Sequence, residues 1–415
     1  MGKEVLIGRL NGKRVFKSVC FLDILTPNRE ITQAVVEDIV LVENLRNISK
    51  GSILKVEGEL RNTSLSRKYE REFYVSHINV LANNYQINVK QELSERKDFR
   101  RQIDAFLSDK VKMLLEFRSE ISQCIRNYFN KGDFIEVQSP KIVDSLVEGP
   151  TNAFEVGFYG RKSYLSISNV LYHHMLLTLG YDKIYEISPN FRQQPYKSKY
   201  QLSEFWALDF SEAWRGRENM IRNLEDLLNF TVDISHRRFD RDLIKFGITL
   251  PKLPKHIEIV EYQEVLKWLN LKEKDYGTHV PRRLTDELKS RNLNALWVVD
   301  APIDKKPFFI KRKDNVSLTA ELWTDRVPIL ASGGERINDY KEALDNMLCL
   351  GIKTENFENY LYALKFGAPP SYTIGMGIER LLQYLTLQPL NHLAIFPRFP
   401  EASKKFKRHQ INNLL

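Results

Sequence analysis

Two neighbouring segments place an arginine and an aromatic residue where they could hold a nucleotide. Tyr185–Arg192 has the pattern of a strand that ends on an arginine, and after a polar loop Leu202–Asp209 resembles a second strand, which carries Phe205. An arginine fork can bind a phosphate through two parallel hydrogen bonds, and an aromatic ring can stack on a base. The hairpin therefore predicts a nucleotide site, although a lone arginine in a hairpin is more often a surface charge.

A third segment, Tyr372–Leu382, combines two glycines with two charged residues. Gly375 and Gly377 interrupt an apolar strand, which indicates close approach of a ligand or of another backbone. Glu379 and Arg380 then open a helix. The spacing of the glycines does not fit the GxGxxG fingerprint, so a dinucleotide site of that kind is only weakly indicated.

These residues must be positioned by a domain that mixes helices and strands. An amphipathic helix is predicted from about residue 109 to Gly132, because its apolar residues recur every three or four positions. A strand follows at Phe134–Val137, before Pro140. Further strands are expected at 163–167, 184–188, 204–210, 296–300, 307–311, 327–332 and 372–377.

Residues 1–85 have a different pattern, with short strands separated by glycine, proline and asparagine. About five short strands in such a segment suit a small Greek-key barrel, of which the OB-fold is one. Residues 86–108 are polar and charged, and we expect a hinge or linker there, which leaves 109–415 as the main domain. The expected fold class is α+β.

Composition excludes several classes of protein. The chain has 415 residues, a net charge of +9 and three cysteines that are far apart and form no CxxC pair. This cysteine usage argues against a disulfide scaffold or a cysteine zinc site and fits a reduced cytoplasm. No apolar run approaches the ~18 residues of a membrane span, and the N-terminus lacks the apolar core of a signal peptide. We therefore expect a cytoplasmic protein, and its basic charge permits a polyanionic partner such as RNA.

In their order and spacing, the segments around Pro140, Arg192 and Arg380 resemble motifs 1, 2 and 3 of the class II aminoacyl-tRNA synthetases, in the aspartyl, asparaginyl and lysyl subgroup. The resemblance implies an anticodon-binding OB-fold at 1–85 and a catalytic domain at 109–415, in which helices flank an antiparallel sheet. It also implies ATP, Mg²⁺ and an amino acid as ligands, tRNA as a partner, and a homodimer formed through motif 1. Shorter segments of the subgroup are matched by Val147–Gly149, Tyr164–Tyr172, Lys306–Phe309, Ser332–Arg336 and Phe396–Arg398.

The resemblance assigns ATP mainly to motifs 2 and 3. Arg192 matches the arginine that holds the α-phosphate and the amino-acid carboxylate, and Arg380 matches the one that covers adenine and reaches the terminal phosphates, so both are expected to be catalytic. Phe205 matches the residue stacked under adenine. Gln194 stands where the subgroup has a glutamate, and it can still accept a hydrogen bond from the adenine amino group.

The metal ligands implied by the resemblance are Glu321 and Ser332, which also belong to the ATP site. A second acidic ligand of the subgroup falls here on Ile329. Asp325 is near in sequence and could replace that acid only if the strand placed both positions on one face. Weaker use of metal is therefore an open alternative.

The amino acid is expected to meet Glu148 and Asp209 at its ammonium group, and Arg336 at its side-chain carboxylate or amide. Other positions of this pocket depart from the subgroup: Val170 and His173 replace a glutamine and a lysine, and Tyr372 replaces a small residue. One interpretation is repacking within a diverged clade. The other is altered specificity, in which the pocket prefers an amide or a differently shaped side chain over aspartate.

Two barrel residues match anticodon contacts of the aspartyl and asparaginyl enzymes. Phe21 matches an aromatic that stacks on an anticodon base, and Gln33 matches a glutamine that reads the same region. Phe21 lies in an alternating strand, so a place in the barrel core is the alternative for it.

The function expected first is ATP-dependent activation of an asparagine-like or aspartate-like amino acid as its adenylate, followed by transfer to tRNA. A second hypothesis is a diverged paralogue that hands the activated acyl group to a small molecule or carrier, as an amide ligase. A third is a non-catalytic, tRNA-binding or regulatory paralogue.

Overall fold

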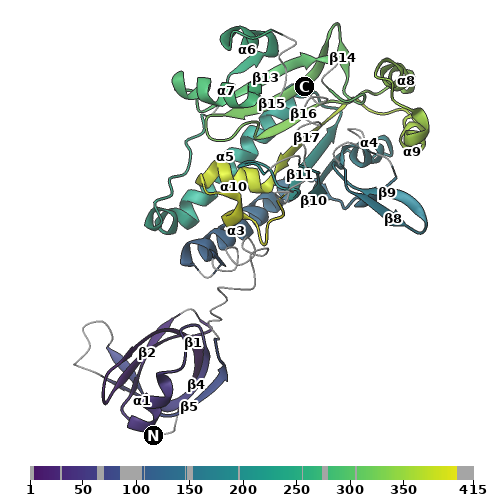
Figure 1. Cartoon of the computed structure of the whole chain (residues 1–415). Coiled ribbons are helices and arrows are strands. Elements are labelled where there is room, and N and C mark those ends of the chain that lie inside the picture. The colour runs from purple at the N-terminus through teal and green to yellow at the C-terminus, as the bar shows by residue number, and fades with distance from the viewer. Residues whose placement is uncertain are drawn as a thin grey trace, which may run out of the picture. The chain divides into compact units, whose positions relative to one another are not determined.

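The computed structural model describes residues 4–28, 30–62, 70–84, 105–106, 108–144, 146, 153–194, 197–254, 256–272, 279–303 and 306–399 (Figure 1). The chain folds as two compact units, Met1–Lys97 and Asp98–Leu415. The linker expected at 86–108 lies mostly outside the described residues, so its limits stay a prediction. No helix in the described part of the chain is long and apolar enough to cross a bilayer.

The N-terminal unit is a closed barrel of five strands in the order β1-β2-β3-β5-β4, as the OB-fold prediction requires (Figure 1). Its elements are β1 (Glu4–Val15), β2 (Cys20–Leu25), β3 (Ile31–Val36), α1 (Ile39–Leu45), β4 (Ile53–Asn62) and β5 (Arg71–Ala82). The barrel is filled by alternate side chains, since Cys20, Leu22 and Ile24 of β2 are fully buried.

Phe21 points to the outer face of the barrel, so the alternative that it belongs to the barrel core is wrong. Its ring meets Phe16 edge-on at 6.0 Å, and the guanidinium of Arg14 lies 5.4 Å from its centroid. Gln33 is buried, and both ends of its amide are occupied: Arg14 donates to Oε1 at 2.7 Å, and Nε2 donates to Glu72. Gln33 therefore holds Arg14 beside Phe21 rather than facing a ligand itself.

The second unit is built on a nine-stranded sheet in the order β12-β13-β15-β16-β17-β11-β10-β6, with β14 paired to β15. Its pairings are antiparallel except at the two ends, where β6 runs parallel to β10 and β12 parallel to β13. The strands are β6 (Ile135–Glu136), β10 (Lys183–Phe191), β11 (Glu204–Ala213), β12 (Ile259–Glu261), β13 (Ala295–Pro302), β14 (Arg312–Lys313), β15 (Val316–Thr324), β16 (Ala331–Glu335) and β17 (Ser371–Gly377).

Helices flank this sheet, as expected for the fold (Figure 1). They are α3 (Asp109–Lys131), α4 (Val170–Thr178), α5 (Arg217–Lys245), α6 (Tyr262–Trp268), α7 (His279–Ser290), α8 (Tyr340–Cys349), α9 (Glu358–Leu364), α10 (Ile378–Thr386) and α11 (Leu390–Leu393). A short 3-10 helix, η5 (Thr354–Phe357), precedes α9, and a separate small sheet is formed by β7 (Ile142–Val143), β8 (Glu155–Phe158) and β9 (Arg161–Leu165).

The long helices α3 and α5 cover one face of the large sheet and share its apolar core. The rings of Phe129, from α3, and Tyr185, from β10, stack with centroids 4.7 Å apart. Leu208 and Phe210 of β11 point into the same core, so their odd-numbered neighbours must point to the other face. This alternation gives the sheet one apolar face and one face free for a site.

Two predicted strands are wrong. Residues 307–311 form a turn with a single bridge from Ile310 to Arg336. The strand expected at 327–332 begins only at Ala331, because the backbone at Ile329 has a φ of 36° and cannot continue an extended chain. The sequence patterns also missed β15, the strand that carries Glu321.

We predict that Gly58→Ala destabilises the barrel. Gly58 lies at a bulge between β4 and β5, where a Cβ would collide with the backbone carbonyl of Tyr74. Overpacking of this kind costs about 1–3 kcal/mol. Hydrogen exchange should rise in peptides of 4–84 and stay unchanged in those of 108–399. Gly157→Ala is the control, because no atom lies within 4 Å of its added Cβ, and equal loss of protection in both variants would contradict the prediction.

Candidate active site

A cavity of about 750 Å³ opens on the sheet face opposite α3 and α5. It is lined by β10, β11, β15, β16 and β17, together with the starts of α4 and α10. Of the residues predicted from the sequence, it brings together Val170, Arg192, Gln194, Phe205, Asp209, Glu321, Ser332, Arg336 and Arg380. Glu148 lies outside the described residues.

Two arginines and an aromatic ring form the cationic end of the cavity. The guanidinium of Arg192 lies 5.9 Å from the ring centroid of Phe205. Burial and then the positive charge of Arg192 lower the pKa of Arg380 to about 10. Two cations close enough to repel each other make a strong site for a polyanion, because a bound phosphate group relieves both the desolvation and the repulsion.

Arg380 is held by backbone carbonyls from two loops. Its NH1 donates to Ile329 O at 2.8 Å and its NH2 donates to Tyr200 O at 3.4 Å. The left-handed backbone of Ile329, at φ 36°, is unfavourable for a β-branched residue. Ile329 stands where the subgroup has a second acidic ligand. In this chain it binds Arg380 through its backbone oxygen instead.

Glu321 and Ser332 lie opposite each other on β15 and β16. Ser332 Oγ donates to Glu321 Oε1 at 3.3 Å, and Lys306 Nζ donates to the same oxygen at 2.5 Å. The two oxygens suit a Mg²⁺ ion that takes its remaining ligands from substrate phosphates and water. Asp325 is not among the cavity-lining residues, so the structure does not support it as a replacement for the missing acid.

Asp209 is a buried carboxylate in the floor of the cavity. Burial raises its pKa above the usual range, and nearby positive groups and a hydrogen bond from Asn169 oppose that rise. The facing strand carries Gly375 directly opposite, and a Cβ there would lie 2.5 Å from Asp209 Oδ1. The glycine predicted to permit close approach therefore makes room for this carboxylate.

Arg336 is a buried guanidinium at the opposite end of the site. It lies 5.0 Å from the ring centroid of Phe309, and NH2 donates to Thr373 O at 3.3 Å, while Nε and NH1 have no hydrogen-bond partner among the residues that the structure describes. Burial lowers its pKa to about 10. His174, which bonds to Tyr360, is kept neutral nearby, since burial and then the charge of Arg336 lower its pKa to about 3.

Two residues predicted to face the amino acid lie elsewhere. The side chain of Tyr372 projects from the other face of the sheet into the core with α5, where its hydroxyl donates to Glu212 at 2.8 Å and accepts from Asn223 at 2.7 Å. His173 is fully buried below the cavity, with Nδ1 3.0 Å from Ser211 Oγ and Nε2 3.4 Å from Glu186. The expectation that Tyr372 narrows the pocket is wrong, because strand alternation turns it away.

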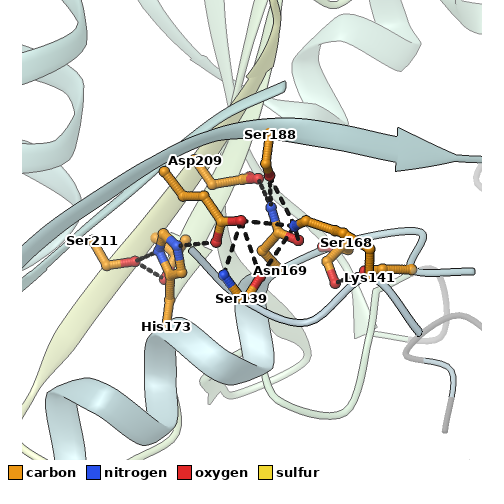
Figure 2. A network of polar contacts seen from close by, with 11 residues as sticks. Ser139, Lys141, Ser168, Asn169, His173, Ser188, Asp209 and Ser211 are labelled. Carbon is orange, nitrogen blue, oxygen red and sulfur yellow. Dashed lines mark hydrogen bonds and ion pairs between the residues drawn. The ribbon is translucent and has the colours of Figure 1, made fainter. Parts of the chain in front are cut away.

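A buried polar network lies beneath Asp209, as Figure 2 shows. Burial by itself would raise the pKa of Glu186, but its contacts with His173 and Lys141 outweigh it and keep the pKa well below its usual range. Asn169 and Ser188 connect this pair to Asp209. Lys141, Asn169 and Glu186 belong to no motif that marks them in the sequence, where their signal is a polar residue at a core position of an apolar segment.

Comparisons with known proteins agree with this geometry. A family model described as tRNA synthetases class II (D, K and N) matches residues 94–400. The aspartate–tRNA(Asp) ligase of Thermococcus kodakarensis is 30% identical over 328 residues, which cover 75% of this chain and 73% of that protein. The aspartate–tRNA(Asp) ligase of Picrophilus torridus is 26% identical over 408 residues, or 93% of each chain.

Among solved structures, asparaginyl-tRNA synthetase from Pyrococcus horikoshii, complexed with asparaginyl-adenylate, is similar in fold. It aligns with a TM-score of 0.82 at 22% identity and covers 96% of this chain and 95% of that one. The extent of the family match, together with the barrel and the antiparallel catalytic sheet, shows that this chain belongs to the class II tRNA synthetases of the D, K and N group.

Proposed function

We propose that this chain activates an amino acid with ATP, as the aminoacyl-adenylate, and transfers the aminoacyl group to tRNA. The observation that carries the proposal is one cavity that holds a phosphate-binding end, with Arg192 and Arg380, beside a buried carboxylate and a buried guanidinium, Asp209 and Arg336. The two arginines of the phosphate-binding end are complementary to the phosphates of ATP. The carboxylate and the other guanidinium are complementary to the charged groups of an amino acid.

At the ATP end, Phe205 stacks under adenine, Gln194 accepts from its amino group, and Arg380 covers the other face. Arg192 holds the α-phosphate and the substrate carboxylate, so that the carboxylate oxygen attacks the α-phosphorus and pyrophosphate leaves. The step requires orientation of two anions and stabilisation of the charge that develops at phosphorus more than it requires an acid or base. The half-buried guanidinium groups of Arg192 and Arg380 supply both.

Glu321 and Ser332 would hold Mg²⁺ on the terminal phosphates. The ion would neutralise phosphate charge when bound. Lys306, already paired with Glu321, adds a further positive charge at this place.

The amino acid would lie between Asp209, which binds its ammonium group, and Arg336, which reads its side chain. Among the described residues Arg336 forms no ion pair, and a buried cation is stabilised more by a carboxylate than by an amide. We therefore propose aspartate as the substrate. The interpretation that the pocket prefers an amide over aspartate loses its basis, since Tyr372 and His173 are not among the described residues that line the cavity, whereas Val170 is.

The barrel is proposed to bind tRNA through the outer face that carries Phe21 and Arg14, with Gln33 as the support of Arg14. A half-buried aromatic on the outer face, beside a cation, suits a stacked base and its phosphate. A homodimer through α3 and the strand before Pro140, and a place in the cytoplasm, complete the proposal.

The proposal is tested by ATP–pyrophosphate exchange with aspartate, asparagine and larger analogues, with and without tRNA. We expect kcat/KM for aspartate to exceed that for asparagine by at least about tenfold, which corresponds to about 1.4 kcal/mol. Charging of tRNA should follow in the same preparation. Exchange without any tRNA charging would favour the amide-ligase paralogue, and no exchange at all would favour the non-catalytic one.

Arg192→Ala should abolish adenylation while the protein stays folded. Loss of a charge-assisted contact to the reacting phosphate costs about 2–4 kcal/mol in the transition state. The control is Tyr372→Phe, which removes a hydroxyl on the opposite face of the sheet. That variant should melt at lower temperature but keep its exchange rate, and near wild-type exchange by Arg192→Ala would show that motif 2 is wrongly assigned.

Phe21→Ala should weaken tRNA binding by about 1–3 kcal/mol, the usual contribution of one base stacked on an aromatic ring. Amino-acid activation without tRNA should be unchanged. The measurement is a filter-binding titration together with a melting curve. Because Phe21 lies outside the barrel core, a large drop in the melting temperature would count against the proposed surface role.

A further inference from the structure

The side chain of Asn169 has an unusual role for its place in the chain. Asn169 is the N-cap residue of α4, a position where asparagine commonly bonds to the first turn, yet its side chain makes no capping hydrogen bond. It is fully buried and bonds instead to three polar groups beneath the cavity. Nδ2 donates to Asp209 Oδ2 at 3.2 Å and to Ser188 Oγ at 2.9 Å, and Oδ1 accepts from Lys141 Nζ at 2.6 Å.

Lys141 determines which way this amide points. Its ammonium group can only donate, so the amide must present its oxygen to Lys141 and its nitrogen to Asp209. Lys141 is itself held at 2.7 Å by the fully buried Glu186 and at 2.9–3.1 Å by the hydroxyls of Ser188 and Ser139 (Figure 2). A rotated amide would place NH₂ against NH₃⁺, which the network does not allow.

The carboxylate of Asp209 is confined from two sides. Asn169 holds Oδ2, and Oδ1 lies in the space that the absent side chain of Gly375 leaves open. Both Asp209 and Val170, the residue after Asn169, line the cavity. Val170 has no polar side-chain atom that could bond to the carboxylate. The amide behind the carboxylate is therefore the group that fixes its orientation.

We propose that Asn169, oriented by Lys141, is a positioning residue that keeps the Asp209 carboxylate aimed at the ammonium group of the amino acid. This inference rests on the proposed function, because it takes Asp209 as the ammonium-binding group. It predicts that Asn169 acts on the amino-acid substrate and not on ATP.

The charged groups around Asp209 give the inference a pH signature. Lys141, His173 and Arg336 favour its ionised form, and Glu186 opposes it. A hydrogen bond from Asn169 to the carboxylate also favours ionisation and lowers the pKa of Asp209. Without that bond the pKa rises, so the acid limb of kcat/KM for the amino acid must move to higher pH.

The test is ATP–pyrophosphate exchange by Asn169→Leu, which keeps the branched shape and the number of heavy atoms of the side chain and removes the donor and the acceptor of the amide. We expect the KM for the amino acid to rise about tenfold, with the KM for ATP unchanged and the acid limb shifted upward. Asn169→Asp should be weaker still, because it sets a second carboxylate against Asp209. If Asn169→Leu does not fold, Asn169→Ser, which cannot span Lys141 and Asp209, takes its place.

The matched control is Asn346→Leu, another buried asparagine, whose Nδ2 donates to Phe308 O at 2.9 Å and which does not line the cavity. It should lower the melting temperature and leave both KM values and the pH profile unchanged. Equal changes in the two KM values, or an unmoved acid limb in a folded Asn169 variant, would overturn the inference. A wild-type protein that shows no exchange with any amino acid would instead overturn the proposed function, and this inference with it.

Discussion

The two faces of the catalytic sheet impose the constraint on which the site depends. Because side chains alternate along a strand, each long strand must place one set in the apolar core under α3 and α5 and the other in the cavity. Leu208 and Phe210 of β11 fill the core, and that packing directs Phe205 and Asp209 into the cavity. The apolar contacts that stabilise the domain therefore also set the geometry of the polar residues.

The charged groups of this site differ in how their charges are compensated inside the protein. Glu186 and Lys141 form an ion pair beneath the cavity, in which the Lys141 ammonium and Glu186 Oε1 also bond to the hydroxyls of Ser188 and Ser139. Arg336 is also buried and Arg380 is half-buried, but backbone carbonyls bind them instead of carboxylates. Such cations retain most of their desolvation cost until an anion arrives. We therefore infer that the paired charges of Glu186 and Lys141 stabilise the site, whereas the charges of Arg336 and Arg380, which are unpaired among the described residues, are suited to bind its ligands.

Two departures from the subgroup pattern take on new roles in the structure. His173 stands where a lysine commonly faces the amino acid, and here it lies below the cavity in contact with Glu186 and Ser211. Ile329 stands where a second acid is usual, and its carbonyl oxygen orients Arg380. A substitution at a substrate-facing position can thus leave the site intact when a hydrogen-bond network or a backbone oxygen takes over the role of the lost side chain.

The sequence by itself determined the barrel, the long helix of motif 1 and the residues at the phosphate end, because alternation, amphipathic period and motif spacing are local properties of the chain. It did not determine which predicted residues share one face: Tyr372 belongs to the core, and Gln33 is buried. Nor did it reveal Lys141 and Asn169, which have no motif of their own. They become a unit with Asp209 only when distant segments pack together, since a buried charge finds its partners through tertiary contacts and not through sequence spacing.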